Sequence, residues 1–365
     1  MGFNCGIVGL PNVGKSTLFN ALTSTAQAEA ANYPFCTIEP NVGRVALPDP
    51  RIDMLGKLSG SEKIIPTFLE VVDIAGLVRG ASKGEGLGNQ FLGHIREVDA
   101  VIEVLRCFDD PNITHVDESI DPLRDAETVE TELMLADLDS VERRIDPLRK
   151  KATADRQAKI EVAVMEKVLA VLQEGKPART AEMTAEEMPI FRHMQLITAK
   201  PILYVCNVDE DSAAEGNEYS QRVIEKAEAE GAGVVIVSAA IESEVSQLGS
   251  QEERQEYLES LGLAEAGLDR LIRSGHALLD LITYLTTGPK ESRAWTVRRG
   301  AAAPEAAGVI HSDFERGFIC AEVINYDDFV ACGSEQAAKD AGKMRQEGRD
   351  YIVQDGDVIL FRFNV

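Results

Sequence analysis

Residues 9–16 read GLPNVGKS and match the phosphate-binding pattern G-x-x-x-x-G-K-S at every required position. Glycines let the backbone curl so that successive N–H groups point at a polyphosphate. In this pattern Lys15 reaches the β- and γ-phosphates, and the Ser16 hydroxyl ligates Mg²⁺. The segment therefore predicts a binding site for a nucleoside triphosphate, with contacts from Asn12, Val13, Gly14, Lys15, Ser16 and Thr17.

The residues on either side of this loop predict the elements that position it. An apolar run at 5–8 indicates a strand, and residues 17–22 indicate a helix whose N-terminal dipole favours bound anions. Further apolar runs, alternating with helical stretches and Gly-marked turns, lie at 68–73, 100–105, 201–207 and 233–238. This alternation predicts an α/β fold with a parallel sheet and crossover helices.

Two more motifs at strand ends suit the same site. In the D-I-A-G motif at 73–76, Asp73 can hold the water shell of Mg²⁺, and Gly76 can place its N–H near a γ-phosphate. The Gly-rich segment 80–88 directly after it has the composition of a switch loop. Thr37 lies in the loop before the next strand, where its hydroxyl can complete the metal shell. The expected metal ligands are Ser16, Thr37 and Asp73.

The residues expected at the base differ from those of a guanine site. Asn207-Val208-Asp209-Glu210 occupies the place where a GTPase carries N-K-x-D. Val208 replaces the lysine whose stem covers the base, and Glu210 is one methylene longer than the aspartate that bonds guanine. A site without these groups discriminates weakly for guanine, so we expect ATP to bind more tightly than GTP. Ser238 and Ala239, after the next strand, fit a backbone contact to the base.

The hydrolysis machinery is expected to be unusual. Ras-like enzymes orient the attacking water with a glutamine directly after D-x-x-G, but here Leu77 holds that position. An aliphatic side chain cannot orient water, so turnover should be slow unless another group takes part. His94 and His115 are the candidates, and Lys15 serves the transferred phosphate. Asn12 lies where related GTPases place a K⁺ ligand.

The bulk composition is that of a globular protein, with 365 residues, 44% hydrophobic and 27% charged. The net charge of -24 disfavours indiscriminate binding to nucleic acid, so we expect no DNA partner. No apolar run suits a membrane span, and the N-terminus lacks a secretory signal. The six cysteines are scattered, which is typical of free thiols in a reducing compartment. These features predict a cytoplasmic protein without a membrane partner.

The pattern along the chain changes character twice. Apolar residues at helical spacing over 128–148 and 159–173 predict a helical hairpin inserted in the nucleotide-binding domain. From about 280 onward, a small α+β domain is indicated by strands at 295–297, 318–324 and 358–363, and by a β-hairpin signal at 351–356. The expected domains are 1–125 with 200–279 for nucleotide binding, 126–199 for the insertion and 280–365 for the C-terminal module.

The predicted hairpin is locally basic. Between 143 and 159 there are seven Lys or Arg residues but only two acidic ones, Asp146 and Asp155. Such a stripe is either a solvated helix face or a docking patch for a polyanion.

Taken in order, the motifs at 9–17, 37, 73–76, 207–210 and 238–240 resemble those of the YchF-type Obg-like ATPases, as does the run NYPFCTIEPN at 32–41. The resemblance covers essentially the whole chain. It implies a Ras-like P-loop G domain, an inserted α-helical coiled-coil hairpin and a C-terminal TGS domain of β-grasp type. It also implies ATP preference through the altered N-x-x-E motif, and association with the ribosome or ribosomal RNA. For hydrolysis, the resemblance points to His115.

The expected function is therefore a slow, Mg²⁺-dependent ATPase that couples its nucleotide state to the ribosome. Two alternatives stay open. One is a GTPase with relaxed base specificity, and the other is a non-hydrolysing adaptor that uses nucleotide only to order its loops.

Overall fold

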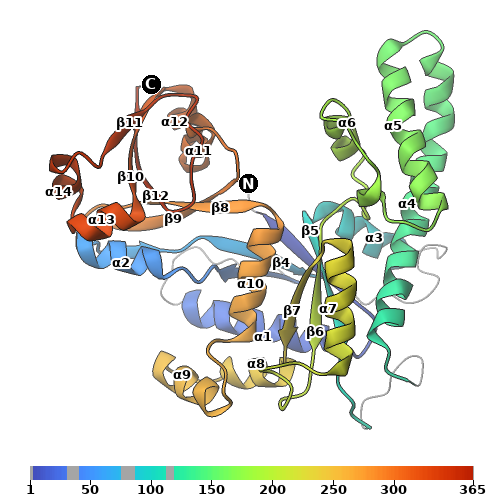
Figure 1. Ribbon diagram of the computed structural model, residues 1–365, viewed down its shortest axis with the longest axis horizontal. Helices are drawn as coiled ribbons and strands as arrows, with labels where there is room; N and C mark the ends of the chain where they lie inside the picture. Colours follow the sequence, from blue (N-terminus) through green and yellow to red (C-terminus); the bar gives the residue numbers. More distant parts are fainter. Residues whose placement is uncertain (1–2, 31–40, 75–86, 112–118, 365) are drawn as a thin grey trace.

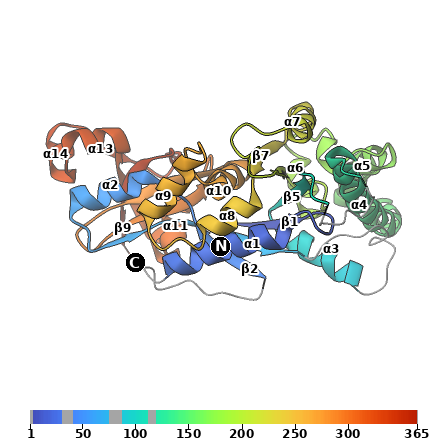
Figure 2. The ribbon, with the colours of Figure 1, turned by 90° about the horizontal axis from the view of Figure 1, so that it is seen from below.

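The computed structural model describes residues 3–30, 41–74, 87–111 and 119–364. Three parts lie in a row along its long axis, as Figures 1 and 2 show from two directions. A sheet made mostly of C-terminal residues lies at one end. A sheet that begins at the N-terminus lies in the middle, and a pair of long helices extends from the other end.

The middle sheet has six strands and carries the phosphate-binding motif. Its order is β2 (Val42–Ala46), β4 (Phe68–Asp73), β1 (Asn4–Val8), β5 (Ala100–Arg106), β6 (Ile202–Asn207) and β7 (Gly233–Val237). All neighbours are parallel except β2 and β4, which are antiparallel. The predicted parallel α/β sheet is thus confirmed for five strands, while the edge strand β2 runs the other way.

Helices cover both faces of this sheet because its central strands are mostly apolar. Every residue of β5 and β6 is buried, as expected for strands covered on two sides. Apolar side chains of several helices join them in one core: α1 (Lys15–Ala30), α3 (Leu87–Glu97), α7 (Glu218–Glu230) and α10 (Gly267–Leu278). Two further helices, α8 (Ala239–Val245) and α9 (Gln251–Ser260), lie between β7 and α10 in the chain.

The helical hairpin consists of α4 (Pro122–Ala152) and α5 (Arg156–Gln173). Aspartates cap both helices: the Asp121 carboxylate accepts from the N–H of Leu123, and Asp155 accepts from that of Gln157. The C-terminal halves of both helices share a core with the short elements that follow, η1 (Ala178–Thr180) and α6 (Met188–His193). The first turns of α4 instead join the core of the middle sheet, so α4 belongs to both parts.

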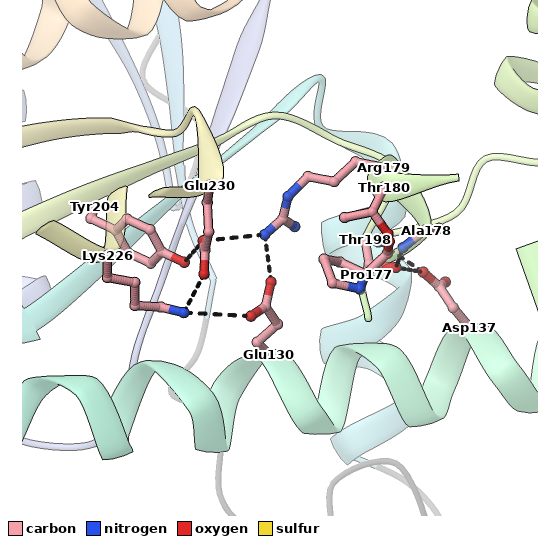
Figure 3. A network of polar contacts seen from close by, with 10 residues as sticks. All are labelled: Glu130, Asp137, Pro177, Ala178, Arg179, Thr180, Thr198, Tyr204, Lys226 and Glu230. Carbon is pink, nitrogen blue, oxygen red and sulfur yellow. Dashed lines mark hydrogen bonds and ion pairs between the residues drawn. The ribbon is translucent and has the colours of Figure 1, made fainter. Parts of the chain in front are cut away.

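A polar network fastens the base of this hairpin to the sheet (Figure 3). Glu130 of α4 pairs with Arg179, and Glu230 of α7 pairs with Lys226. Arg179 also approaches Glu230 at 3.7 Å, and the Tyr204 hydroxyl of β6 donates to Glu230 at 2.9 Å. These partly buried, mutually bonded charges fix α4 against α7 and β6.

Asp137 of α4 forms a second set of hydrogen bonds at this junction (Figure 3). Its carboxylate is fully buried and accepts from the N–H of Ile197 at 3.0 Å and from the N–H and hydroxyl of Thr198, each at 2.7 Å. The Thr198 hydroxyl in turn accepts from the N–H of Ala178 at 3.0 Å. One side chain of α4 therefore positions the segment by which the chain returns to β6.

The second sheet forms the C-terminal module. Its order is β11 (Arg345–Glu347), β10 (Phe318–Asn325), β12 (Asp357–Phe363), β8 (Leu281–Thr286), β9 (Glu291–Arg298) and β3 (Lys63–Ile65). Helix α11 (Ala303–Ile310) packs on its core and is followed by α12 (Ser312–Arg316), α13 (Tyr326–Cys332) and α14 (Glu335–Asp340). A mixed sheet with a helix packed against it agrees with the β-grasp module that the resemblance implies.

Strand β3 and helix α2 (Pro50–Ser59) depart from the predicted division of the chain. The sequence analysis placed residues 50–65 in the nucleotide-binding domain, but β3 pairs with β9 and extends the second sheet. Ile52 and Leu55 of α2 pack with Phe329 in the core of that sheet. The apolar stripe of α2 is buried by residues far along the chain, which local patterns do not reveal. The other domain limits stay predictions.

The β-hairpin predicted at 351–356 is wrong. Ile352 forms only an isolated bridge to Ala302. Strand β12 is already paired with β10 and β8 on its two sides, so the preceding residues have no edge to join. The Asp355 carboxylate is used elsewhere, since it accepts from the N–H of Thr283 at 2.8 Å and pairs with Arg51 at 2.7 Å.

The cysteines match the expectation of free thiols. The described cysteines are unpaired, and four of them are buried; Cys36 lies outside the described residues. Burial raises the pKa of Cys5 to about 12, which keeps its thiol protonated and unreactive. None of the helices in the described ranges combines the length and apolar character that a membrane crossing requires.

We predict that Asp137→Ala lowers the free energy of unfolding by about 3 kcal/mol, because three buried donors lose their shared acceptor. Urea unfolding followed by circular dichroism measures this change. Asp139→Ala is the matched control on the same helix, since Asp139 is exposed and pairs with the exposed Arg143; it should change stability by less than about 0.5 kcal/mol. Equal effects of the two substitutions would contradict the stabilising role of the Asp137 hydrogen bonds.

Candidate nucleotide-binding site

The phosphate-binding loop connects β1 to α1, as predicted. Gly9 and Gly14 have φ values of 147° and 100°, which side chains on L-residues rarely allow. A Cβ atom at Gly9 would lie 2.5 Å from the Val104 carbonyl oxygen, and one at Gly14 would lie 2.3 Å from Asn207 Nδ2. Both positions thus require glycine, because of their backbone conformation and because neighbouring atoms leave no room for a Cβ atom. The loop ends at the N-terminus of α1, where unpaired N–H groups attract anions.

Lys15 is buried at the centre of this loop. Its Nζ donates to the Leu10 carbonyl oxygen at 2.6 Å. Burial lowers the pKa of Lys15 to about 8, and the nearby Asp73 carboxylate opposes this shift. Burial therefore destabilises the charged form of Lys15, and the negative charge of a bound phosphate would stabilise it.

Asp73 and Ser16 supply oxygen donors beside Lys15. Asp73 ends β4, and burial raises the pKa of its carboxyl while the Lys15 ammonium lowers it. Ser16 is exposed in the first turn of α1. Mg²⁺ prefers a few hard oxygen ligands together with phosphates and water. Within the described ranges no group of three His, Cys, Asp or Glu side chains forms a metal cage. This sparse donor set fits a Mg²⁺ that arrives with a nucleotide.

Asn207 joins three loops of the site. Its Nδ2 donates to the Val13 carbonyl oxygen at 2.9 Å, and its Oδ1 accepts from the N–H of Ala239 at 2.9 Å. Asn207, Val13 and Ala239 were each predicted to contact the nucleotide. In the structure these particular groups bond one another, so Asn207 positions the loop and the start of α8.

A pocket of about 740 Å³ opens beside the loop. The following predicted residues line it: Asn12, Gly14, Thr17, Asn207, Val208, Glu210, Ala239 and Ala240. A further wall of the pocket lies shortly after β5 and consists of Phe108, Asp109, Asp110 and Pro111. The pocket therefore extends from the phosphate-binding loop to the N-x-x-E motif, as a nucleotide requires.

Val208 and Glu210 differ in their surroundings. Val208 is 3% exposed, and its N–H donates to the Val237 carbonyl oxygen at 2.9 Å. Glu210 is exposed at the rim. Ser238 precedes α8, and its buried hydroxyl has no hydrogen-bond partner among the residues that the structure describes. The floor of the base pocket is thus apolar at the position where a guanine site carries a lysine.

Several predicted site residues lie outside the described residues, namely Thr37, Gly76, Leu77 and His115. Most of the Gly-rich segment 80–88 lies outside them as well, and α3 begins at Leu87 within it. His94 is exposed on α3.

The wall at Phe108–Pro111 was not among the residues predicted from the sequence. A usable signal was present, because loops after the carboxyl ends of parallel strands surround the ligand in open α/β sheets. Residues 108–111 directly follow the predicted strand at 100–105. The same rule could have pointed to Asp211 beyond the N-x-x-E motif, which also lines the pocket.

Comparisons with known proteins agree on one family. Residues 4–137 match the family model of 50S ribosome-binding GTPases, and residues 281–364 match that of the YchF GTPase C-terminal region, described as a protein of unknown function. The chain is 59% identical to "Ribosome-binding ATPase YchF" of Haemophilus influenzae and 58% identical to that of Haemophilus ducreyi, over 100% of both chains in each case.

A solved structure supports the same assignment. The chain resembles the YchF GTPase of Schizosaccharomyces pombe with a TM-score of 0.89 and 38% identity, covering 99% of this chain and 98% of that one. The bacterial relatives are named ATPases, whereas the yeast protein is named a GTPase. These names leave base preference to be argued from the site itself.

We predict that nucleotide binding at pH 8 takes up about half a proton, because Lys15 is half deprotonated there and phosphate restores its charge. The uptake should vanish below about pH 6.5, where Lys15 is already charged, and the affinity should fall as the pH rises above 8. Calorimetry with Mg²⁺-saturated nucleotide, in buffers of different ionisation enthalpy, measures the uptake.

Lys15→Met is the control for this measurement, since its residual binding should show no dependence on the buffer. Heats for the unmodified protein that are the same in all buffers at pH 8 would mean that Lys15 keeps its proton without the ligand.

Proposed function

Because this chain belongs to the YchF family, we propose that it is a ribosome-associated P-loop ATPase that binds ATP in the pocket beside Lys15 and hydrolyses it slowly. The family assignment rests on full-length identity to proteins named ribosome-binding ATPases. In the proposed site Lys15 and the surrounding loop hold the phosphates, and the walls at 108–111 and 207–211 enclose the base.

The preference for ATP over GTP rests on Val208. In N-K-x-D sites a lysine stem covers guanine and an aspartate bonds its N1–H and 2-amino groups. Here a buried valine lines the pocket at the lysine position, and the longer Glu210 lies at the exposed rim. Sites that reject an analogue strongly do so with placed polar partners, and this pocket lacks that arrangement for guanine.

The metal and catalytic assignments are part of the proposal. Ser16, Asp73 and Thr37 would hold Mg²⁺ against the phosphates, and the backbone of Gly76 would contact the γ-phosphate. Asn12 is the proposed K⁺ ligand; it has a φ of 63° and lies on the pocket lining. With Leu77 in place of a glutamine, we assign the assisting role in hydrolysis to His115.

The helical hairpin is the proposed ribosome contact. Several of its basic residues already have partners, since Arg143 pairs with Asp139, Arg149 with Glu166 and Lys151 with Asp155. In the part of the chain that the structure describes, Lys150, Arg156 and Lys159 form no ion pair and are exposed near the turn between α4 and α5. This smaller set, named the tip cluster, is free to meet RNA phosphates. A cytoplasmic location follows from a ribosomal partner, and neither DNA nor a membrane is expected as one.

We predict that ATP binds at least about tenfold more tightly than GTP in calorimetry with Mg²⁺. The double variant Val208→Lys, Glu210→Asp rebuilds the guanine contacts and should shift this ratio toward GTP. Tighter GTP binding by the unmodified protein would favour the alternative of a GTPase with relaxed specificity. Turnover no higher than that of Lys15→Ala, with ribosomes and K⁺ present, would favour the non-hydrolysing adaptor.

We also predict that Lys150→Glu with Lys159→Glu weakens ribosome binding by about tenfold at low salt and flattens its salt dependence, because fewer phosphate counterions are released. Cosedimentation at several KCl concentrations measures both effects. Lys176→Glu is the control for reversing a lysine away from the tip, because Lys176 is exposed just after the other end of α5 and is paired with Glu174; it should have little effect. If the tip variant and the control bind alike, the tip cluster is an ordinary solvated helix face.

A further inference from the structure

Arg106, the last residue of β5, is among the largest fully buried side chains of the described residues and is 1% exposed. We propose that Arg106 is a positioning residue that holds the wall at 107–111 in the shape that binds the base. This inference rests on the proposed function, because it concerns the affinity of the same pocket for its nucleotide.

The guanidinium of Arg106 bonds the wall at two points. Its Nε donates to the carbonyl oxygen of Phe108 at 3.2 Å, and its Nη2 donates to that of Asp110 at 3.1 Å. The guanidinium carbon also lies 4.7 Å from the centroid of the Phe108 ring. A planar fork with several fixed donors suits two carbonyls in one turn, which a single ammonium cannot bridge in the same way.

The wall that Arg106 holds is part of the lining of the base pocket. Phe108–Pro111 line the pocket together with Val208–Asp211 and Ala239–Ala240. Asn207 bonds the N–H of Ala239 at the start of α8, whereas Phe108–Pro111 form a turn after the end of β5. Its shape therefore depends on bonds to its backbone.

Asn217 supplies an independent tether to the same turn. Its Nδ2 donates to the Cys107 carbonyl oxygen at 2.7 Å, while its Oδ1 accepts from the N–H of Ser220 at 3.0 Å and caps α7. The N–H of Cys107 donates to the Asn207 carbonyl oxygen at 2.8 Å. Two side chains from different elements thus bond three carbonyls of this short wall.

Burying an arginine carries a large desolvation penalty, which other interactions have to offset. The hydrogen bonds of Arg106 to the carbonyl oxygens of Phe108 and Asp110 contribute to this compensation. Without Arg106 these carbonyls would turn toward water or other donors, and the wall would sample several shapes. Binding of the base would then have to order the wall again, and this loss of conformational entropy would lower the affinity for the nucleotide.

The bonds that carry the proposal differ from the bond that holds Lys15. Arg106 donates to the carbonyl oxygens of Phe108 and Asp110, whereas Lys15 donates to that of Leu10 within the phosphate-binding loop. The expected effect is therefore on nucleotide affinity and not on turnover at saturation.

The test uses Arg106→Lys, which keeps the charge but loses the fork, and Asn217→Asp, which keeps the helix cap but loses the donor to Cys107. We expect each to raise the Kd for Mg²⁺-ATP about tenfold, while kcat at saturating ATP stays within about twofold. Calorimetry gives Kd, and phosphate release gives kcat. Thermal unfolding without nucleotide checks that each variant is folded.

Arg349→Lys is the matched control. Arg349 makes the same kind of contact in the C-terminal module, where it donates to the Phe318 carbonyl oxygen at 3.2 Å and lies 5.7 Å over the Phe318 ring. It should change neither Kd nor kcat.

An unchanged Kd in both folded variants would overturn the inference, as would a loss of kcat at constant Kd, which would place Arg106 in hydrolysis. Failure of the unmodified, folded protein to bind ATP would instead refute the proposed function. The two failures are thus distinguishable.

Discussion

The side-chain amide of Asn207 is the contact on which the site depends. It accepts from the N–H of Ala239 and donates to the carbonyl oxygen of Val13, so it joins the end of β6, the phosphate-binding loop and the start of α8. The same amide fills the space where a Cβ at Gly14 would otherwise fit. The amide therefore connects the phosphate end of the pocket to its base end.

The phosphate side of this arrangement could be predicted from the sequence because its determinants are local. The glycines and Lys15 lie within eight consecutive residues, and the strand before them and the helix after them follow from short apolar runs. The base side is less local. Asn207 could be placed at the site because it ends a strand. Phe108 and Asp110 were missed as pocket walls because the strand-end rule was not applied to the loop after β5, and the bonds of the buried arginine that hold this loop leave no pattern in the sequence. The attachment of α2 and β3 to the second sheet was missed for a similar reason, since their partners lie more than 200 residues away.

The junction between hairpin and sheet shows how burial sets charge in this protein. Glu103, at the centre of β5, is fully buried, and neither of its carboxyl oxygens has a hydrogen-bond partner among the described residues. Burial raises its pKa well above the usual range, Glu130 acts in the same direction, and Lys226 and Arg179 oppose them. The two cations in Figure 3 are already balanced by Glu130 and Glu230. A neutral Glu103 keeps that balance, whereas an ionised one would leave an excess negative charge between α4 and the sheet.

Lys15 illustrates how binding energy is divided between the two ends of the site. Its bond to Leu10 and its burial have to be replaced when a phosphate takes the ammonium, so the net gain is smaller than that of a bare ion pair. The triphosphate is common to ATP and GTP, and discrimination between them therefore has to come from the base pocket. That pocket is apolar at Val208 and is closed by a wall held through Arg106 and Asn217. Under the proposed function, selectivity thus rests on the shape of two strand-end loops, while the phosphate-binding loop supplies affinity for any nucleoside triphosphate.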